Sequence, residues 1–272
     1  MWDCPRPDVS CGAATESRHV GEFEFDEQVS MFHPQGPACW ELAVQAFSST
    51  ERGYDLLATK FDYTPYRTPD KVLAPMMAHL GGHIGAGGSM SAALDVCCGT
   101  GAALRHLRPL CRDRVVGIDF SRGMLQVARQ KLADAPGDAA VELVRGNVMD
   151  MPFDAAFDAA VCVGALGHIT PSEQPRFVSQ VARTLKPGGR FVLVTAPPPP
   201  WGSARYWRGR SFNAAMQVRN WMVKPPFMMF YLMFPLSRVV ALLEAHRFAV
   251  TVQPDVFDTP FRKMQLVIGT LS

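Results

Sequence analysis

From Ser91 onward the sequence alternates between short apolar runs and amphipathic stretches, and this alternation constrains the fold more than any other feature. The apolar runs, each typical of a buried strand, are AALDVCC, RVVGID, VELVRG, FDAAVCVG, GRFVLVTA, FAVTVQP and KMQLVIGT. Helices are predicted over 101–110, 121–132, 172–185 and 236–245, with Ser121 capping the second and the turn KPGG preceding the fifth strand. Strands separated by such helices form a parallel sheet covered on both faces. The predicted class is therefore doubly wound α/β.

Composition agrees with a well-buried globular protein. The chain has 272 residues, of which 48% are hydrophobic and 19% are charged, and a chain of this size buries about 75% of the surface that its unfolded form exposes. We therefore expect one large domain with an appendage. The formal net charge is only +2, so the surface as a whole gives no reason to expect attraction to nucleic acid, and no DNA partner is expected.

Three further features of the sequence indicate in which cellular compartment the protein is expected. No uncharged apolar run approaches the roughly 20 residues of a membrane-spanning helix. The amino terminus lacks the basic start and apolar stretch of a secretory signal. The seven cysteines are odd in number and scattered, which fits neither a disulfide framework nor a paired zinc site. We expect reduced thiols, no bound metal and a cytoplasmic protein.

Two regions differ in character from the alternating part. Residues 1–84 are interpreted as an amino-terminal extension and helical cap, with an apolar helical patch near Trp40 and a helix that Thr68 or Asp70 caps. The apolar face of this capped helix consists of Val72, Leu73, Met76, Met77 and Leu80. Residues 85–272 form the predicted main domain, and 197–235 interrupt it after the fifth strand. We expect this insertion to be a lid.

The turn after the first predicted strand is where a ligand is expected, because ligands of open parallel sheets bind beyond the carboxyl ends of the strands. Gly99 and Gly101 allow a tight bend and a close approach of backbone to ligand. The second strand ends at Asp119, eighteen positions after Gly101, near the spacing at which a carboxylate meets a ribose. A nucleoside fits both features. A dinucleotide fits less well, because Leu104 stands where a third glycine is needed.

Five strings at consecutive strand ends carry a resemblance to a known family: LDVCCGTG, VVGIDFSRGML, VRGNVMDMPF, FDAAVCVGALGHI and LKPGGRFVLV. Together they resemble the class I S-adenosylmethionine-dependent methyltransferases, especially the small-molecule branch that includes the ubiquinone and menaquinone methyltransferases. The likeness covers about residues 54–196. It implies a Rossmann-like, seven-stranded, mostly parallel sheet with an antiparallel last strand, and S-adenosylmethionine as cofactor.

Site residues follow from the same resemblance. It implies that the loop around the methionine part of the cofactor consists of Asp95, Cys97, Gly99 and Gly101, and that Asp119 binds the ribose. The adenine would lie beside Phe120, Met124, Asn147 and Val148. Val163 and Gly164 would form the floor beneath the sulfonium, and Tyr54 would close over the cofactor. The family often has Gly where Cys97 stands and commonly Asp where Asn147 stands. An asparagine keeps an acceptor oxygen for the adenine amino group. Because the ribose site is expected to be partly exposed, we expect little effect on folding when Asp119 is replaced by alanine.

The acceptor side is less defined. His168, after the fourth strand, is the candidate general base, since histidine removes protons near neutral pH. Candidates for substrate contact are Tyr66, Arg67, Trp201, Trp207 and Phe230. The lid pairs a basic, aromatic half with an almost wholly apolar half, which suits an amphipathic acceptor or contact with a membrane surface. A helical cap that only completes the core is the alternative, and we favour a lid that faces the substrate.

The leading interpretation is methyl transfer, by in-line displacement, to a small apolar or amphipathic acceptor such as a quinone, a polyketide or a terpenoid. RNA methylation is an alternative, motivated by the basic aromatic stretch but without an appended RNA-binding module. A non-catalytic binding protein with the cofactor fold is a third. The acceptor atom and the oligomeric state stay open.

Overall fold

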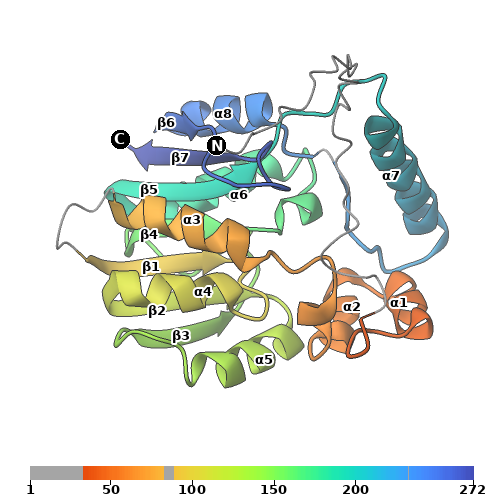
Figure 1. Ribbon diagram of the computed structural model, residues 1–272, viewed down its shortest axis with the longest axis horizontal. Helices are drawn as coiled ribbons and strands as arrows, with labels where there is room; N and C mark the ends of the chain where they lie inside the picture. Colours follow the sequence, from red (N-terminus) through yellow and green to blue (C-terminus); the bar gives the residue numbers. More distant parts are fainter. Residues whose placement is uncertain (1–32, 83–88, 232) are drawn as a thin grey trace, which may run out of the picture.

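One seven-stranded sheet forms the centre of the computed structural model, which describes residues 33–82, 89–231 and 233–272 (Figure 1). The strands are β1 (Met90–Val96), β2 (Cys111–Asp119), β3 (Ala140–Arg145), β4 (Phe157–Cys162), β5 (Leu185–Thr195), β6 (Phe248–Gln253) and β7 (Gln265–Leu271), in spatial order β3-β2-β1-β4-β5-β7-β6. β1 to β5 pair in parallel, whereas β7 is antiparallel to both β5 and β6. The predicted mostly parallel sheet with an antiparallel last strand is confirmed. The first 32 residues of the predicted extension lie outside the described residues.

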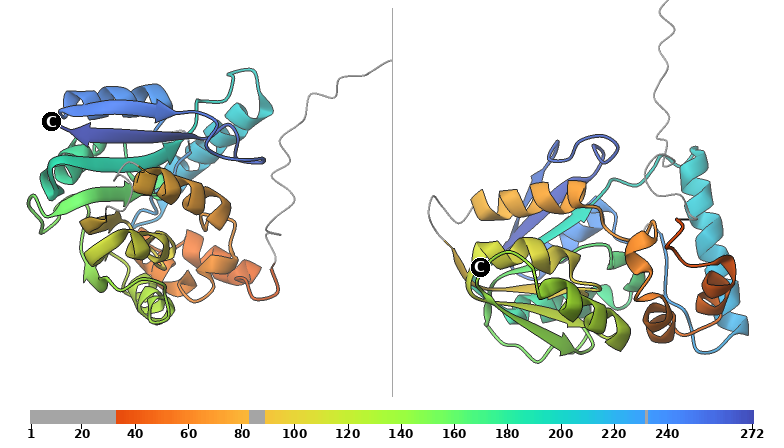
Figure 2. Two further views of the ribbon diagram at one scale, coloured as in Figure 1. Left: turned by 60° about the vertical axis from the view of Figure 1, so that its left-hand side comes forward. Right: turned by 60° about the horizontal axis from the view of Figure 1, so that its bottom comes forward.

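Helices cover both faces of this sheet (Figures 1 and 2). The helices are α1 (Cys39–Ala46), α2 (Thr50–Leu57), α3 (Asp70–Gly82), α4 (Ala102–Leu107), α5 (Arg122–Leu132), α6 (Gln174–Thr184), α7 (Ala204–Met222) and α8 (Leu236–Ala245). Apolar side chains of α3, α4 and α5 share one core cluster with one face of the sheet. Those of α6 and α8 share a second cluster with the opposite face. This two-sided burial explains why the central strands are apolar at nearly every position.

The sequence placed α3 in the amino-terminal cap, but the structure packs it on the sheet. All five residues of its predicted apolar face are buried, and they join the core cluster that includes Ala93 and Val115. The cap over the carboxyl edge of the sheet therefore consists of α1 and α2, with α7 beside them (Figure 1).

Two element boundaries differ from the prediction. The helix predicted over 101–110 ends as an α-helix at Leu107 and continues as a single 3-10 turn, because Pro109 has no N–H for the α-helical pattern. The predicted turn KPGG is instead the beginning of β5. Leu185 already pairs with Phe157, and the register shifts before Arg190 pairs with Ala159.

The segment predicted to be a lid, residues 197–235, contains the unusually exposed helix α7. α7 has 19 residues, and none of them is buried. It stands away from the sheet and next to α1 in Figure 1 and in the right view of Figure 2. Among the described residues, no helix combines the length and the apolar character that spanning a bilayer requires.

Candidate functional site

The candidate site lies at the carboxyl edge of the parallel strands, where strand order reverses. β1 pairs with β2 on one side and with β4 on the other, so the connections after these strands diverge and leave room for a ligand between them. Asp95 is the penultimate residue of β1, Asp119 is the last residue of β2 and Cys162 the last of β4. The topology thus brings three of the predicted strand ends to one place.

The loop after β1 uses its two glycines differently. Gly99 has φ +52°, and a Cβ there would meet no atom within 4 Å. Gly101 has φ +82°, and its Cβ would lie 3.0 Å from Leu132 Cδ1 and 3.3 Å from Ala128 Cβ. Gly99 therefore borders open space, as a ligand-binding loop requires, whereas Gly101 allows α4 to pack against α5.

This difference predicts that two matched substitutions affect stability and ligand binding to different extents. Gly101→Ala should lower the free energy of unfolding by about 2–4 kcal/mol, because backbone strain adds to overpacking. Gly99→Ala should lower it by about 1 kcal/mol through strain alone, yet weaken binding of S-adenosylhomocysteine. Denaturant unfolding and calorimetric titration of both variants check this. Equal stability losses, or unchanged affinity in Gly99→Ala, would contradict the assignment of the open side of the loop to a ligand.

Asp119 lies inside this edge and is tied to the backbone around it. Its Oδ2 accepts a hydrogen bond from Gly99 N at 2.9 Å, and its Oδ1 accepts one from Ser121 N at 2.9 Å. The residue is only 6% exposed, so the expected partial exposure is wrong, because the loop and the cap enclose it. Burial raises the pKa of this carboxyl, and the neighbouring Asp55 adds to the increase.

Asp95 provides the clearest sign of a missing partner. The side chain is 2% exposed, and its Oδ2 has no hydrogen-bond partner among the described residues. Burial, followed by repulsion from Asp119, raises the pKa of Asp95 well above its usual value. A buried carboxylate oxygen without a donor costs stability unless a ligand satisfies it. An ammonium group at this position fits both the charge and the orphaned oxygen.

The vicinal cysteines pack on opposite sides of the sheet although they follow the end of β1 at Val96, and Cys97 has φ 61°. Cys98 belongs to the core under α3, α4 and α5, whereas Cys97 packs against the opposite cluster. A hydrogen bond to Cys162 and burial raise the pKa of the Cys97 thiol well above its ordinary value. These thiols therefore stay protonated and behave as small packing residues.

His168 and Tyr54 meet above the edge. The Tyr54 hydroxyl and His168 Nε2 lie 2.7 Å apart, and His168 Nδ1 bonds the carbonyl of Met228. A carbonyl only accepts, so Nδ1 carries the proton and Nε2 presents its lone pair toward Tyr54. Burial lowers the pKa of His168 and raises that of Tyr54. Phe227 stacks on Tyr54 with ring centroids 6.4 Å apart. The result is a neutral histidine in an apolar enclosure.

Two acidic residues that the sequence analysis missed fasten the cap to the edge. Asp55 Oδ1 accepts hydrogen bonds from Ser121 Oγ at 2.7 Å and from Gly123 N at 2.8 Å. Asp62 Oδ1 accepts one from Thr100 Oγ1 at 2.7 Å. The phrase YDLL already contained Asp55 beside Tyr54. No local pattern indicated Asp62, whose partner lies 38 positions away.

The residues predicted for the adenine side gather near the same edge. The ring of Phe120 meets that of Tyr54 edge-on at 6.3 Å. Met124 is fully buried between α2 and α5. Asn147 Oδ1 accepts a hydrogen bond from Met149 N at 2.9 Å, so its predicted acceptor oxygen already serves a local turn. Val148 is buried in the core. Their contact with adenine stays a prediction.

On the other side of the edge, Val163 is partly buried against the core under α3, α4 and α5. The next residue, Gly164, has φ +78°, and a Cβ there would lie 2.9 Å from Thr68 Oγ1. This close approach brings the loop after β4 against the segment that precedes α3. The predicted floor beneath the sulfonium is therefore near the covering segment, and its contact with a cofactor stays a prediction.

The predicted substrate residues are spread more widely. Phe230 N donates a hydrogen bond to Gly167 O at 2.9 Å, beside His168. The guanidinium of Arg67 pairs with Asp70 at 3.1 Å. Tyr66 is 41% exposed, and Trp201 and Trp207 are 80% and 57% exposed. The structure thus places the backbone of Phe230 beside the loop that carries His168, and substrate contact by all five residues stays a prediction.

Comparison with known proteins agrees with this geometry. Residues 93–189 match the family model described as "Methyltransferase domain". The likeness is therefore to a methyltransferase domain, and it extends over this range of the chain. The matched range runs from β1 into β5 and includes every strand end that forms the candidate edge.

Named relatives extend the comparison. The chain is 38% identical over 123 residues to a demethylmenaquinone methyltransferase of Symbiobacterium thermophilum, which covers 42% of this chain and 48% of the relative. It is 36% identical over 104 residues to a 2-phytyl-1,4-naphtoquinone methyltransferase of Trichormus variabilis, covering 37% and 44%. The chain therefore spans about half the length of the curated relatives that it matches.

A solved structure confirms the fold. The DhpI-SAH complex superposes with a TM-score of 0.58 at 20% identity, covering 83% of this chain and 97% of that one. At this level of identity, the likeness concerns the arrangement of strands and helices alone.

Proposed function

We propose that this protein transfers the methyl group of S-adenosylmethionine to a small, apolar or amphipathic acceptor of the quinone type. The observation that supports it best is the orphaned Oδ2 of buried Asp95, which lies at the same edge as Asp119 and open-sided Gly99. The names of two relatives specify demethylmenaquinone and a phytyl naphtoquinone, which supports a quinone ring as the acceptor.

Three residues would hold the cofactor. The Asp119 carboxylate would bind the two ribose hydroxyls through lone pairs that its backbone donors leave free, because each carboxylate oxygen accepts more than one hydrogen bond. Asp95 would pair its free oxygen with the amino group of the methionine part, and Gly99 would let the backbone approach. When bound, S-adenosylmethionine supplies a methyl group activated by a sulfonium. The protein's task is then alignment in a dry enclosure.

The base in this proposal is His168. Its Nδ1–H is fixed on the Met228 carbonyl, so the lone pair on Nε2 is available to take a proton. Tyr54 bonds that nitrogen at 2.7 Å. It would either give its proton to Nε2 while taking one from the acceptor hydroxyl, or be displaced by that hydroxyl. Removing the proton of a hydroquinone hydroxyl increases electron density on the oxygen and on the ring. This assistance applies to both oxygen and carbon acceptors.

The segment after α7 would form the apolar wall for the acceptor. Phe227 is buried against Tyr54, Met228 holds His168, and Phe230 bonds the loop that carries His168. Aromatic and methionine side chains suit a flat apolar ring because they adapt to irregular ligands. This arrangement supports the predicted lid that faces the substrate.

Incubation with methyl-labelled S-adenosylmethionine and a reduced demethyl naphthoquinone tests the proposal. We expect label in the lipid-soluble fraction, identified as the methylated quinone by mass spectrometry. A lipid-soluble extract tested in parallel would reveal a polyketide or terpenoid acceptor instead. Absence of transfer to both acceptors by protein that binds S-adenosylhomocysteine would favour a non-catalytic binding protein.

A further inference from the structure

The helix α1 turns its apolar side toward solvent. Trp40, Val44 and Phe47 are spaced four and three positions apart, which puts them on one side of the helix. They are 68%, 44% and 67% exposed, whereas the buried residue of this helix is Gln45. A surface helix normally faces its apolar stripe to the core. The stripe of α1 is therefore built for contact with something other than the described part of this chain.

The carboxyl end of α7 continues this exposed apolar surface. Val218, Trp221 and Met222 are 54%, 83% and 65% exposed. Arg219 joins the two helices, because its Nε donates to Ala46 O at 2.7 Å and its Nη2 donates to Ser48 O at 2.8 Å. We call six exposed residues the docking face. They lie on α1, at its C-cap Phe47 and on α7: Trp40, Val44, Phe47, Val218, Trp221 and Met222.

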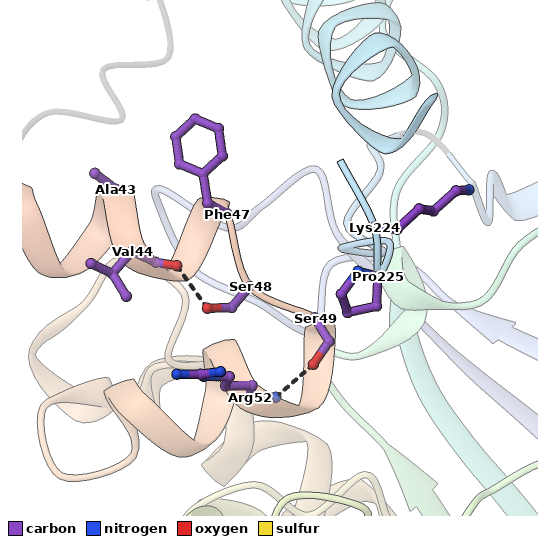
Figure 3. Close-up of a pocket in the computed structure, with 8 residues that line it drawn as sticks. All are labelled: Ala43, Val44, Phe47, Ser48, Ser49, Arg52, Lys224 and Pro225. Carbon is purple, nitrogen blue, oxygen red and sulfur yellow. Dashed lines mark hydrogen bonds between the residues drawn. The ribbon is translucent and has the colours of Figure 1, made fainter. Parts of the chain in front are cut away.

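A hollow of about 540 Å³ adjoins the docking face at Val44 and Phe47 (Figure 3). It is lined by Ala43, Val44, Phe47, Ser48, Ser49, Arg52, Lys224 and Pro225, so that it joins α1 and α2 to the segment after α7. In Figure 3 the Lys224 side chain extends away from the other lining residues, whereas Arg52 lies on α2 beneath Val44. The lining combines apolar residues, two serines and two cations, and such an amphipathic surface suits contact with lipid.

The charge around the docking face is one-sided. No acidic residue occurs between Glu173 and Glu244, a stretch that contains all of α7. Arg52 and Lys224 form no ion pair with any residue in the described ranges, and both are exposed. The acidic side chains of the two cap helices nearest the face are already paired, Glu41 with Lys60 and Glu51 with Arg145, both at 2.7 Å. The face therefore complements an anionic partner.

We propose that the docking face binds the surface of an anionic lipid bilayer. Tryptophans and cations on a helix that lies flat in the interface are the combination that such binding uses. The proposal rests on the proposed function in that an apolar acceptor would reside in the bilayer. Pro225 lines the hollow, and within three residues Phe227 stacks on Tyr54 and Met228 holds His168. The bilayer contact and the base therefore share one short segment.

Sedimentation of the full chain with lipid vesicles tests the proposal without cofactor or acceptor, so its outcome is independent of methyl transfer. We expect binding to phosphatidylglycerol–phosphatidylcholine vesicles, little binding to phosphatidylcholine alone, and a loss of binding as salt increases. Arg52→Gln combined with Lys224→Gln should weaken the partition by about 30-fold. Phe47→Ser combined with Trp221→Ser should weaken it by roughly tenfold or more.

Trp201→Ser is the matched control. Trp201 is 80% exposed, like Trp221, but precedes α7 at its other end, about 28 Å away along a helix of this length. We expect this variant to partition like the wild type. Trp221→Ser alone should weaken the partition, unlike Trp201→Ser. Equal losses in these two single variants, equal binding to neutral and anionic vesicles, or retention on RNA without vesicle binding would each overturn the proposal. Thermal melts of all variants should coincide, since every altered side chain is exposed.

Discussion

Replacing Asp119 by alanine is expected to weaken binding of S-adenosylhomocysteine by about 100- to 1000-fold, because two hydrogen bonds from ribose hydroxyls to a carboxylate are lost. The effect is large because the carboxylate is enclosed and already oriented by Gly99 N and Ser121 N. A ligand that binds the Asp119 carboxylate therefore forms its hydrogen bonds without the entropic cost of ordering this side chain. Isothermal titration calorimetry measures the change directly.

Asp113→Ala is the matched control, since Asp113 is on the same strand near its other end, where it bonds Ser91 and Arg112. We expect its affinity for S-adenosylhomocysteine to equal that of the wild type. Asp119→Asn should lose affinity while keeping one acceptor oxygen for the surrounding backbone. Wild-type affinity in both Asp119 variants would remove the ribose assignment.

Asp119 is also expected to lower the stability of the ligand-free protein when it ionises. Burial raises the pKa of Asp119 in the folded protein, so the unfolded chain ionises first as pH rises. Folding stability without ligand is therefore lost between the ordinary pKa of about 4 and the raised pKa. Asp119→Asn lacks this loss, and its Tm relative to the wild type should rise over that pH interval.

Replacing His168 by alanine is expected to lower kcat by about 100- to 10,000-fold, the range typical of a general base. Affinity for S-adenosylhomocysteine should not change, because His168 bonds Tyr54 and Met228 and neither of the two carboxylates. Single-turnover transfer of labelled methyl measures the rate, and calorimetry measures the affinity.

The pH profile separates a base from a merely structural residue. Burial lowers the pKa of His168, so the wild-type rate should fall on the acid side with a midpoint below about 6.5. His246→Ala is the control, because His246 also bonds a backbone carbonyl, that of Leu242, but lies beside the start of β6, at the opposite edge of the sheet. Full activity in His168→Ala, or an unchanged acid limb, would show that proton removal does not need this residue.

The sheet and the strand-end loops could be predicted from the sequence because their signals are local. Apolar runs separated by amphipathic stretches specify a parallel sheet, and the sheet then brings Asp95 and Asp119 to one edge. The N-cap at Ser121 was also predicted, and its Oγ accepts a hydrogen bond from Met124 N at 3.1 Å. Short-range pattern and chain topology were sufficient for these features.

The closed geometry of the site could not be predicted, because it depends on contacts between distant segments. Tyr54 reaches His168 across 114 positions, and Met228 O meets His168 across 60. The expected partial exposure of Asp119 was wrong for the same reason, since the cap that encloses it is a tertiary feature. The exposure of the apolar side of α1 could not be predicted either, because the apolar pattern around Trp40 does not indicate which side of the helix faces the protein.

A crystal structure with bound S-adenosylhomocysteine tests the central claim most directly. We expect both ribose hydroxyls within hydrogen-bond distance of the Asp119 carboxylate and the amino group of the ligand against Asp95 Oδ2, with the sulfur directed toward His168. Ligand bound in the hollow between α1 and α2, or at the edge with Asp95 Oδ2 still unpartnered, would contradict the account.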